Sequence, residues 1–352
     1  MQLNIALLSG DGIGPEVIDQ AVKVCNAIAQ KFNHYIKWMP ALTGASAIYA
    51  VGEPYPEETH KICVSSDAVL FGAVGDPRFD NDPSSKVRPE QGLLKMRQKL
   101  GLFANVRPTF TFPSLIDKSP LKRERIEGTD LIFLRELTGG VYFGKRGRKD
   151  KGNTAFDTCT YTREEIKRLA KKGFELAMTR SKKLCCVDKA NVLESSRLWR
   201  ETVQAMEKDY PEVNVSYEFV DAVAMRLVQW PNSYDVLITE NLFGDILTDE
   251  ASVISGSMGL MPSASIGKKN SLFEPIHGSY PEATGKNIAN PLAAILSAAM
   301  MFEESFQLEE EANLIKKLVD KSIENGIVSK DISNGNKYFS TNEIGDWIVN
   351  EI

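Results

Sequence analysis

Two aspartates, Asp245 and Asp249, lie four residues apart in the segment GDILTDEAS. If this segment begins a helix, both carboxylates point to the same side. Two such charges repel each other unless a cation joins them, and Mg²⁺ or Mn²⁺ takes oxygen ligands from a few carboxylates and a substrate. A simpler interpretation is that acidic side chains stabilise the first turn of a helix. The residues alone leave both interpretations open.

Charged and polar residues also follow the predicted strands. Open α/β sheets bind ligands beyond the carboxyl ends of their strands. The residues at these predicted strand ends are Arg135 and Glu136, then Asp188, Lys189 and Asn191, then Asp221, and finally Glu240 and Asn241. This pattern predicts a cluster of both charges at one sheet edge.

Three arginines, Arg97, Arg107 and Arg135, are suited to bind a di-anionic substrate, because the planar guanidinium group pairs well with carboxylates. Taken singly, each is more often part of a surface ion pair. The three histidines are too few to predict a zinc site, and only His277, in FEPIHGSYPE, lies in a segment of suggestive composition.

The segment Gly10–Gly14 follows the first predicted strand and resembles a dinucleotide-binding fingerprint. Its spacing is GxGxG rather than GxGxxG, and residues 29–32 supply no acidic residue for a ribose. The spacing favours a tight turn packed near a ligand over a Rossmann site.

Elements that position these residues alternate between strand and helix. We predict strands at 3–8, 68–74, 131–135, 183–187, 214–220 and 234–239, and helices at 162–179, 195–208, 291–306, 309–324 and 341–351. Near-continuous apolar strands alternating with helices indicate an α/β protein with a mainly parallel sheet flanked by helices. The segment 139–161, with GKRGRKDKGN between the β-prone pieces VYF and CTYT, predicts a protruding hairpin-like arm with a solvated tip.

Composition limits the partners. The 352 residues carry 42 Lys and Arg against 47 Asp and Glu, a net charge of −5, so we expect a small-molecule partner and no nucleic acid or membrane. The longest apolar block, 291–302, is too short to span a membrane, and residues 1–10 do not resemble a signal peptide. Five cysteines without a CxxC pair predict buried free thiols in a reducing compartment, and hence a cytoplasmic protein.

Several long motifs resemble those of the isocitrate/isopropylmalate family of β-decarboxylating dehydrogenases, and specifically its members that act on 3-isopropylmalate. They are SGDGIGPEV (9–17), RPEQGLLKMR (88–97), FANVRP (103–108), RELTGGVYFG (135–144), VDKANVLESS (187–196), NLFGDILTDEAS (241–252), GSMGLMPSAS (256–265) and FEPIHGS (273–279). The resemblance extends from residue 1 to about 350.

This resemblance implies a two-domain fold that is not a Rossmann fold. The first, cofactor-binding domain would combine 1–102 with 256–352, and the second, at 103–255, would carry the dimerisation surface, the metal and substrate residues and the arm. It also implies a homodimer with shared active sites, in which Lys189 and Asp221 enter the other subunit's cleft.

The implied reaction is NAD-dependent oxidation and decarboxylation of 3-isopropylmalate to 2-oxo-4-methylpentanoate and CO₂ in leucine biosynthesis. Asp245 and Asp249, with Asp221 from the partner, would bind Mg²⁺ or Mn²⁺. Lys189 would be the general base and Tyr142 would protonate the enol, while Arg97, Arg107 and Arg135 would bind the carboxylates.

The resemblance further implies which residues bind NAD. Ile13 and the loop from Gly75 to Glu90 would lie near the nicotinamide, and Gly278, Ser279 and Asn290 near the adenosine. Glu282 takes the place of an aspartate that usually accepts hydrogen bonds from the ribose, and its negative charge still favours NAD over NADP. The implied cofactor-binding set is Ile13, Gly75, Glu90, Glu274, His277, Gly278, Ser279, Glu282 and Asn290.

Residues 88–97 bear on which acid the protein binds as its substrate. Leu93 would offer an apolar wall to an isopropyl group, and Glu90 would repel the third carboxylate of isocitrate. Alternatively, Leu93 and Leu94 are the buried face of a helix. Isocitrate, homoisocitrate, tartrate and D-malate stay open as alternative substrates, and a non-catalytic regulatory subunit on the same fold is a remote alternative.

Overall fold

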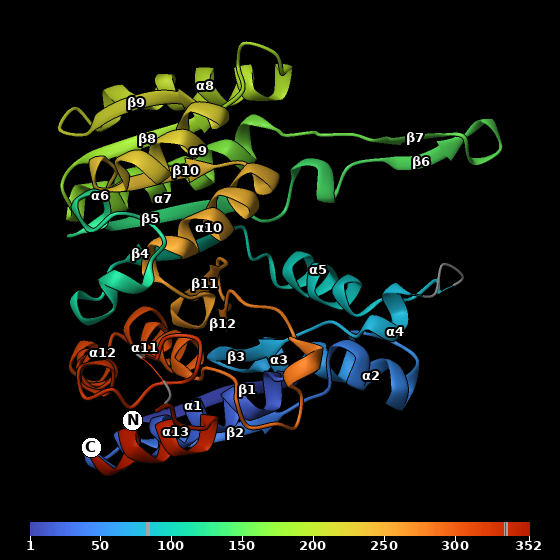
Figure 1. The fold of residues 1–352 in the computed structure, drawn as a ribbon. Helices are drawn as coiled ribbons and strands as arrows, with labels where there is room; N and C mark the ends of the chain where they lie inside the picture. The colour runs from blue at the N-terminus through green and yellow to red at the C-terminus, as the bar shows by residue number, and fades with distance from the viewer. Residues whose placement is uncertain (82–84, 334, 336) are drawn as a thin grey trace. The chain divides into compact units, whose positions relative to one another are not determined.

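The computed structural model describes residues 1–81, 85–333, 335 and 337–352, and it divides into two compact units, Met1–Leu102 with Gly256–Ile352, and Phe103–Ser255. Each unit has a sheet covered by helices (Figure 1), so the predicted α/β class with a mainly parallel sheet is confirmed. Among the described residues, no helix has the length and apolar character needed to cross a membrane.

The sheet of the first unit has the strand order β2-β1-β3-β12-β11. β1 is parallel to β2 and β3, β12 is parallel to β3, and β11 is antiparallel to β12. The strands of this unit are β1 (Gln2–Gly10), β2 (Tyr35–Pro40), β3 (Ala68–Ala73), β11 (Pro262–Ile266) and β12 (Ser271–Pro275). Its helices are α1 (Gly14–Lys31), α2 (Gly44–Val51), α3 (Glu57–Ser65), α4 (Pro77–Asp80), α5 (Pro89–Leu100), α11 (Leu292–Phe306), α12 (Glu309–Glu324) and α13 (Thr341–Asn350).

The sheet of the second unit has the order β4-β5-β10-β8-β9. All of its strands are parallel to their neighbours except β4, which is antiparallel to β5. The strands are β4 (Ala104–Phe110), β5 (Asp130–Glu136), β8 (Lys183–Asp188), β9 (Asn214–Phe219) and β10 (Val236–Thr239), and the helices are α6 (Arg123–Ile126), α7 (Arg163–Thr179), α8 (Glu194–Met206), α9 (Val220–Gln229) and α10 (Asn241–Ser255).

Local sequence explains several of these boundaries. Pro15 occupies the first turn of α1, where its missing N–H costs nothing. Thr162 and Glu165 form a capping box at the start of α7, in which the Thr162 N–H and hydroxyl both bind Glu165 Oε2 at 2.8 Å. The predicted strand at 234–239 begins two residues later, at Val236, and the Asp235 carboxylate directly before it accepts hydrogen bonds from Arg180 and Ser181.

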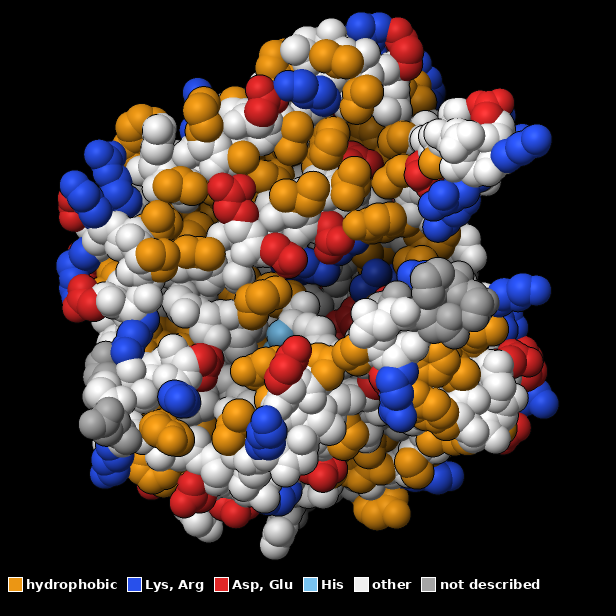
Figure 2. Space-filling view, turned by 45° about the vertical axis from the view of Figure 1, so that its right-hand side comes forward, with side chains coloured by type: hydrophobic (Ala, Val, Ile, Leu, Met, Phe, Trp, Pro, Cys, Tyr) orange, Lys and Arg blue, Asp and Glu red, His pale blue; other side chains and the backbone are white. Residues whose placement is uncertain are grey.

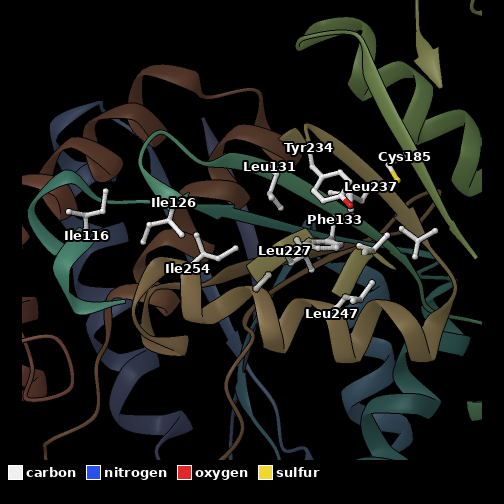
Figure 3. Packing of buried hydrophobic residues seen from close by; sticks show 13 residues of the cluster. Ile116, Ile126, Leu131, Phe133, Cys185, Leu227, Tyr234, Leu237, Leu247 and Ile254 are labelled. Carbon is white, nitrogen blue, oxygen red and sulfur yellow. The ribbon is translucent and has the colours of Figure 1, made fainter. Parts of the chain in front are cut away.

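Buried hydrophobic side chains fill the interior of each unit. In the second unit Phe133 and Leu237 of the sheet pack with Leu247 of α10 and Leu227 of α9 (Figure 3). Burying this apolar surface against one face of the sheet fixes the position of α10, the helix that carries both aspartates.

The predicted arm is confirmed as a hairpin, but its strands differ from those expected. β6 (Arg146–Lys149) lies within the charged run 144–153 expected to be the tip, and it pairs antiparallel with β7 (Thr154–Asp157), which follows that run (Figure 1). The piece VYF instead lies around a short 3-10 helix, η2 (Gly140–Tyr142). Gly140 takes a positive φ of 74° there and its N–H donates to the Thr160 carbonyl at 3.0 Å, so this piece turns rather than extends.

All five cysteines are free thiols, but one expectation about them is wrong. Cys25, Cys63, Cys185 and Cys186 are buried, whereas Cys159 is exposed. Cys159 follows β7 at the base of the arm, outside the cores of the sheets, which explains its exposure.

Candidate active site

The carboxyl ends of four strands share one edge of the second unit's sheet. β5, β10, β8 and β9 run parallel, so the residues that follow them emerge on the same side. β4 runs the other way, and its register places Asn105 opposite Arg135 at the end of β5. The fold therefore brings Asn105 and Arg107 to the edge that carries Arg135.

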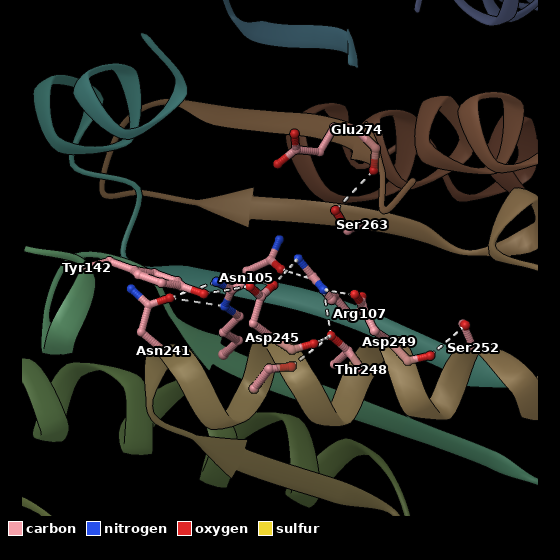
Figure 4. Close-up of polar contacts among 12 residues, drawn as sticks. Asn105, Arg107, Tyr142, Asn241, Asp245, Thr248, Asp249, Ser252, Ser263 and Glu274 are labelled. Carbon is pink, nitrogen blue, oxygen red and sulfur yellow. Dashed lines mark hydrogen bonds and ion pairs between the residues drawn. The ribbon is translucent and has the colours of Figure 1, made fainter. Parts of the chain in front are cut away.

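Two buried arginines form the centre of a polar cluster at this edge (Figure 4). The Arg107 Nη1 atom donates to the Thr248 hydroxyl at 2.5 Å and lies 3.9 Å from an Asp249 carboxylate oxygen. The Arg107 Nη2 atom lies 3.8 Å from an Asp245 oxygen, and Arg135 Nη1 forms an ion pair with the same oxygen. Two positive charges thus face two carboxylates.

Asp245 and Asp249 lie one turn apart on α10, so their side chains share a face as their spacing predicted. α10 begins at Asn241, and its first turn contains no acidic residue, so the first-turn interpretation is wrong. Desolvation raises the pKa of Asp249 above its usual value, and Asp245 adds to this shift while Arg107 opposes it. A cation beside both carboxylates would relieve their repulsion.

Tyr142 adds a hydroxyl group to the cluster. Its hydroxyl donates to Asp245 Oδ2 at 2.8 Å, and the Arg135 guanidinium lies 5.7 Å from the ring centroid. Desolvation, followed by the hydrogen bond to Asp245, raises the pKa of Tyr142 to about 12. The phenol therefore stays protonated at neutral pH and is a proton donor in this cluster.

Lys189 and Asp221 form an ion pair with each other within the same chain. The hydrogen bond from Lys189 lowers the pKa of Asp221. Asp221 follows the carboxyl end of β9, as predicted: β9 ends at Phe219, and Asp221 lies in the first turn of α9. Within the described part of one chain, no group of three His, Cys, Asp or Glu side chains is arranged to hold a metal ion.

Sequence reasoning missed a buried network behind Arg135. Tyr161 donates its hydroxyl hydrogen to Glu240 Oε2 at 3.0 Å and accepts a hydrogen bond from the Asn241 N–H at 2.9 Å. Desolvation, assisted by the nearby charge of Glu136, raises the pKa of the buried Glu240. The only sequence signal was the position of Glu240 and Asn241 directly after β10; nothing in the sequence points to Tyr161.

Replacing Tyr161 with phenylalanine is expected to destabilise the protein by about 1–3 kcal/mol, because a buried N–H and a buried carboxylate each lose a partner. The free energy of unfolding, measured by urea denaturation, checks this. Tyr210→Phe is a matched control, because the half-buried Tyr210 stacks on Phe174 but lies outside this network. Equal stability of Tyr161→Phe and Tyr210→Phe would contradict the assignment.

In the first unit, four of the predicted cofactor-binding residues line one pocket of about 800 Å³: Ile13, His277, Gly278 and Asn290. The pocket is also lined by Asp331 and Tyr338, which sequence reasoning missed. Burial lowers the pKa of His277, and its buried Nε2 atom has no hydrogen-bond partner among the described groups. A neutral imidazole with an unpaired nitrogen suits a heteroaromatic ligand.

Other predicted cofactor residues gather around Ser279. The Ser279 carbonyl accepts a hydrogen bond from the Ile13 N–H at 2.8 Å and lies so close to Gly12 that a side chain at position 12 would collide with it. Gly12 also has a positive φ of 60°, which explains glycine in this turn. A methyl group placed on Gly75 would lie 2.9 Å from the Ser279 hydroxyl and 3.4 Å from Glu90 Oε1, so these residues are neighbours.

Gly75 lines a second pocket of about 350 Å³, with Asp11 and Tyr49 among its other residues. Glu282 is exposed on a short 3-10 helix, η7 (Pro281–Ala283). Residues 82–84 of the predicted Gly75–Glu90 loop lie outside the described residues.

Arg97 and Glu274 form an ion pair in the first unit, with the Arg97 Nη2 atom 3.1 Å from Glu274 Oε1. Both are buried, and the backbone of Glu274 accepts a hydrogen bond from the Ser263 hydroxyl at 3.0 Å (Figure 4). Their roles in binding substrate and cofactor stay predictions. Leu93 is half-buried against the hydrophobic core of this unit, and Leu94 is also half-buried, so both helix-face and pocket roles fit.

Solved structures with the same fold indicate the class of protein. The structure of isocitrate dehydrogenase from Methylococcus capsulatus matches with a TM-score of 0.90 and 32% identity, covering 99% of this chain and 98% of that one. A β-decarboxylating dehydrogenase from Thermococcus kodakarensis matches with a TM-score of 0.79 and 34% identity, covering 99% of this chain and 96% of the other. Fold and site together define an enzyme of the decarboxylating dehydrogenase class.

Sequence comparison gives the family. The family model described as isocitrate/isopropylmalate dehydrogenase matches residues 4–348, and the chain belongs to this family. A 3-isopropylmalate dehydrogenase of Bacteroides fragilis is 57% identical over 353 residues, covering 100% of this chain and 99% of that relative. A 3-isopropylmalate dehydrogenase of Bacillus subtilis is 48% identical over 353 residues, covering 99% of this chain and 96% of that relative.

Proposed function

We propose that the protein oxidises and decarboxylates 3-isopropylmalate with NAD⁺, giving 2-oxo-4-methylpentanoate, CO₂ and NADH in leucine biosynthesis. The observation that carries the proposal is the cluster of Arg107, Arg135, Asp245 and Asp249 at one sheet edge, in a chain 57% identical over its full length to a 3-isopropylmalate dehydrogenase. The free thiols are compatible with a cytoplasmic enzyme.

Arg107 and Arg135 would bind the carboxylates of the substrate. Both guanidinium groups are almost fully buried, so their charges act in surroundings that screen them less than water does. Each already faces an aspartate, and the arrangement of both charges in one cluster suits a ligand that carries carboxylates together with a cation.

Asp245 and Asp249 would hold the Mg²⁺ or Mn²⁺ ion. Their carboxylate oxygens are the donors that such hard cations prefer, and the pair shares one helix face. The ion would supply positive charge that stabilises the negative charge developing on the substrate. Asp221 of the same chain lies on α9, where it pairs with Lys189, and no group of three His, Cys, Asp or Glu side chains that could hold a metal ion is found among the described residues of one chain.

Lys189 would take the proton from the substrate hydroxyl, and Tyr142 would return a proton to the carbon that loses CO₂. Tyr142 is suited to this role because its phenol is protonated at neutral pH and its hydroxyl already acts as a hydrogen-bond donor, to Asp245 Oδ2. Lys189 and Asp221 would act in the active site of a second copy of the chain.

A homodimer is the assembly in which each chain would contribute Lys189 and Asp221 to the active site of the other. The helices of the second unit expose large apolar side chains, and Figure 2 shows hydrophobic side chains gathered on the surface. The exposed large apolar side chains of these helices are Met225 and Val228 on α9, with Trp230 after it, and Ile246 and Val253 on α10. Exposed apolar side chains on adjacent helices are typical of a protein interface, and Ile246 directly follows the proposed metal ligand Asp245.

NAD⁺ would bind the first unit, in the pocket lined by Ile13, His277, Gly278 and Asn290. The neutral His277 ring suits packing against the adenine. NAD⁺ held in this pocket would supply the acceptor for the hydride that the oxidation releases. The negative charge of Glu282 would disfavour the 2′-phosphate of NADP⁺.

Purified protein with Mg²⁺ tests the proposal directly. We expect NADH to form with 3-isopropylmalate and NAD⁺, with a lower kcat/KM for isocitrate and for NADP⁺. The M. capsulatus structure makes isocitrate the alternative substrate to compare. An equal or higher kcat/KM with isocitrate would overturn the substrate assignment, and lack of turnover of both acids would overturn the activity.

Replacing Leu93 with asparagine is expected to lower kcat/KM for 3-isopropylmalate by about 10-fold or more while changing that for D-malate much less, because only the former has an isopropyl group to bury. Leu94→Asn is the matched control on the same helix, half-buried like Leu93. A loss shared equally by both substrates would refute the pocket role of Leu93 and favour its role in packing.

A further inference from the structure

We propose that Asn105 and Asn241 are positioning residues that hold Arg107 and Arg135 by neutral hydrogen bonds, so that the arginines keep their positive charge for the substrate. This inference rests on the proposed function, because it assigns substrate carboxylates as the ligands of the two arginines.

The same arrangement occurs at both arginines. The Arg107 Nε atom donates to Asn105 Oδ1 at 2.6 Å (Figure 4). Asn241 Oδ1 accepts hydrogen bonds from Arg135 Nε at 3.1 Å and Nη2 at 2.8 Å. Both asparagines are at most 1% exposed. Each arginine is therefore held at its Nε edge by a buried amide oxygen.

Neutral acceptors matter here because a buried carboxylate could hold the guanidinium group in the same position, but its negative charge would neutralise the arginine. With amide oxygens at their Nε edges, the guanidinium groups face Asp245, Asp249 and Thr248 through their other nitrogens, and the amides add no further negative charge to either arginine. Aspartate has almost the same shape as asparagine but carries a negative charge. Asparagine at both positions therefore favours a role that requires a neutral oxygen acceptor.

Asn241 is itself fixed on several sides. Its Nδ2 atom donates to the Gly139 carbonyl at 3.2 Å, and its backbone N–H donates to the Tyr161 hydroxyl at 2.9 Å. The stem of Arg135 also leaves no room for a side chain at Gly244, where an added methyl group would lie 2.7 Å from the Arg135 Cγ atom. Both the stem and the Nε edge of Arg135 are thus held before a substrate binds, as preorganised binding requires.

A pair of replacements at each position separates charge from shape. Asn→Asp keeps the shape and adds a negative charge, whereas Asn→Ser changes the shape and stays neutral with an oxygen acceptor. Both replacements remove the amide N–H that Asn241 donates to the Gly139 carbonyl, so the comparison between them is not decided by that loss. At positions 105 and 241 alike, we expect KM for 3-isopropylmalate to rise about 10-fold or more in the aspartate variant and to stay closer to wild type in the serine variant, with KM for NAD⁺ within about twofold of wild type. Asn214→Asp is the matched control, because it adds the same charge to an exposed residue at the start of β9.

The opposite ordering, with aspartate better tolerated than serine, would overturn the inference and leave the asparagines a purely structural role. Circular dichroism and the melting temperature identify variants that do not fold, and either position alone tests the ordering. The wild type is first assayed with 3-isopropylmalate and isocitrate. The KM values of the aspartate and serine variants are then measured with the acid that the wild type prefers. A preference for isocitrate would refute the proposed substrate. The comparison of KM between the aspartate and serine variants would still decide the role of the asparagines.

Discussion

Replacing Lys189 with alanine is expected to lower kcat by about 10²- to 10⁴-fold, the contribution usual for a positioned general base. The reason is chemical rather than structural: the side chain is half-buried, and its ion-pair partner Asp221 is exposed, so alanine leaves no buried charge behind. Steady-state kinetics with 3-isopropylmalate and NAD⁺ measure the change.

Lys189→Arg sharpens this test. Arginine keeps a positive partner for Asp221, but it stays protonated at any usable pH and cannot accept the substrate's proton. We therefore expect the arginine variant to be nearly as inactive as the alanine variant. Lys183→Ala, at the exposed start of the same strand β8, is the control that should retain full turnover.

Two outcomes would remove Lys189 as the base. One is near-normal kcat in either variant. The other is a loss of activity that accompanies dissociation of the assembly, which sedimentation of each variant would show. An intact assembly with low kcat supports the assignment.

Removal of the divalent cation is the second large effect. A chelator should abolish turnover, and Mg²⁺ or Mn²⁺ should restore it, because the cation would stabilise the negative charge that forms on the substrate oxygen. Asp249→Asn should raise the Mg²⁺ concentration needed for half-maximal activity by about 10-fold or more, since an amide oxygen is a weaker ligand than a carboxylate.

Glu250→Gln is the matched control for the metal site. It removes a carboxylate from the next residue of α10, where desolvation also raises the pKa of the side chain. Mn²⁺ binding followed by electron paramagnetic resonance gives a readout that does not depend on turnover. Normal turnover by the chelated wild type, or equal Mn²⁺ affinity of Asp249→Asn and Glu250→Gln, would contradict the assignment.

The secondary structure that positions the site was largely predictable, because each element is a local pattern. β5, β8 and α7 lie within about a residue of the predicted ranges, since apolar runs and the Thr162 cap define them. The start of α10 was placed too late, because Asn241 and Glu240 are polar and carry no periodic signal. The strands of the arm were misplaced because β6 and β7 are almost wholly exposed and have no buried face to reveal them.

The sequence by itself determined the chemistry available to this protein. The spacing of Asp245 and Asp249 set two carboxylates on one helix face, and the long motifs identified the family. Residue type and local spacing suffice for such conclusions because a helical turn is a local structure.

Only the tertiary structure decided which groups meet. Apart from the Asn105–Arg107 hydrogen bond, which joins residues two apart on β4, these contacts are long-range. Arg107 faces Asp249 across 142 positions of sequence, and Asn241 reaches Arg135 across 106 positions because α10 packs beside β5. The structure also turned Lys189 toward Asp221 rather than toward the aspartates of α10. These contacts depend on strand order and on the burial of apolar side chains far away in the chain, which no local pattern encodes.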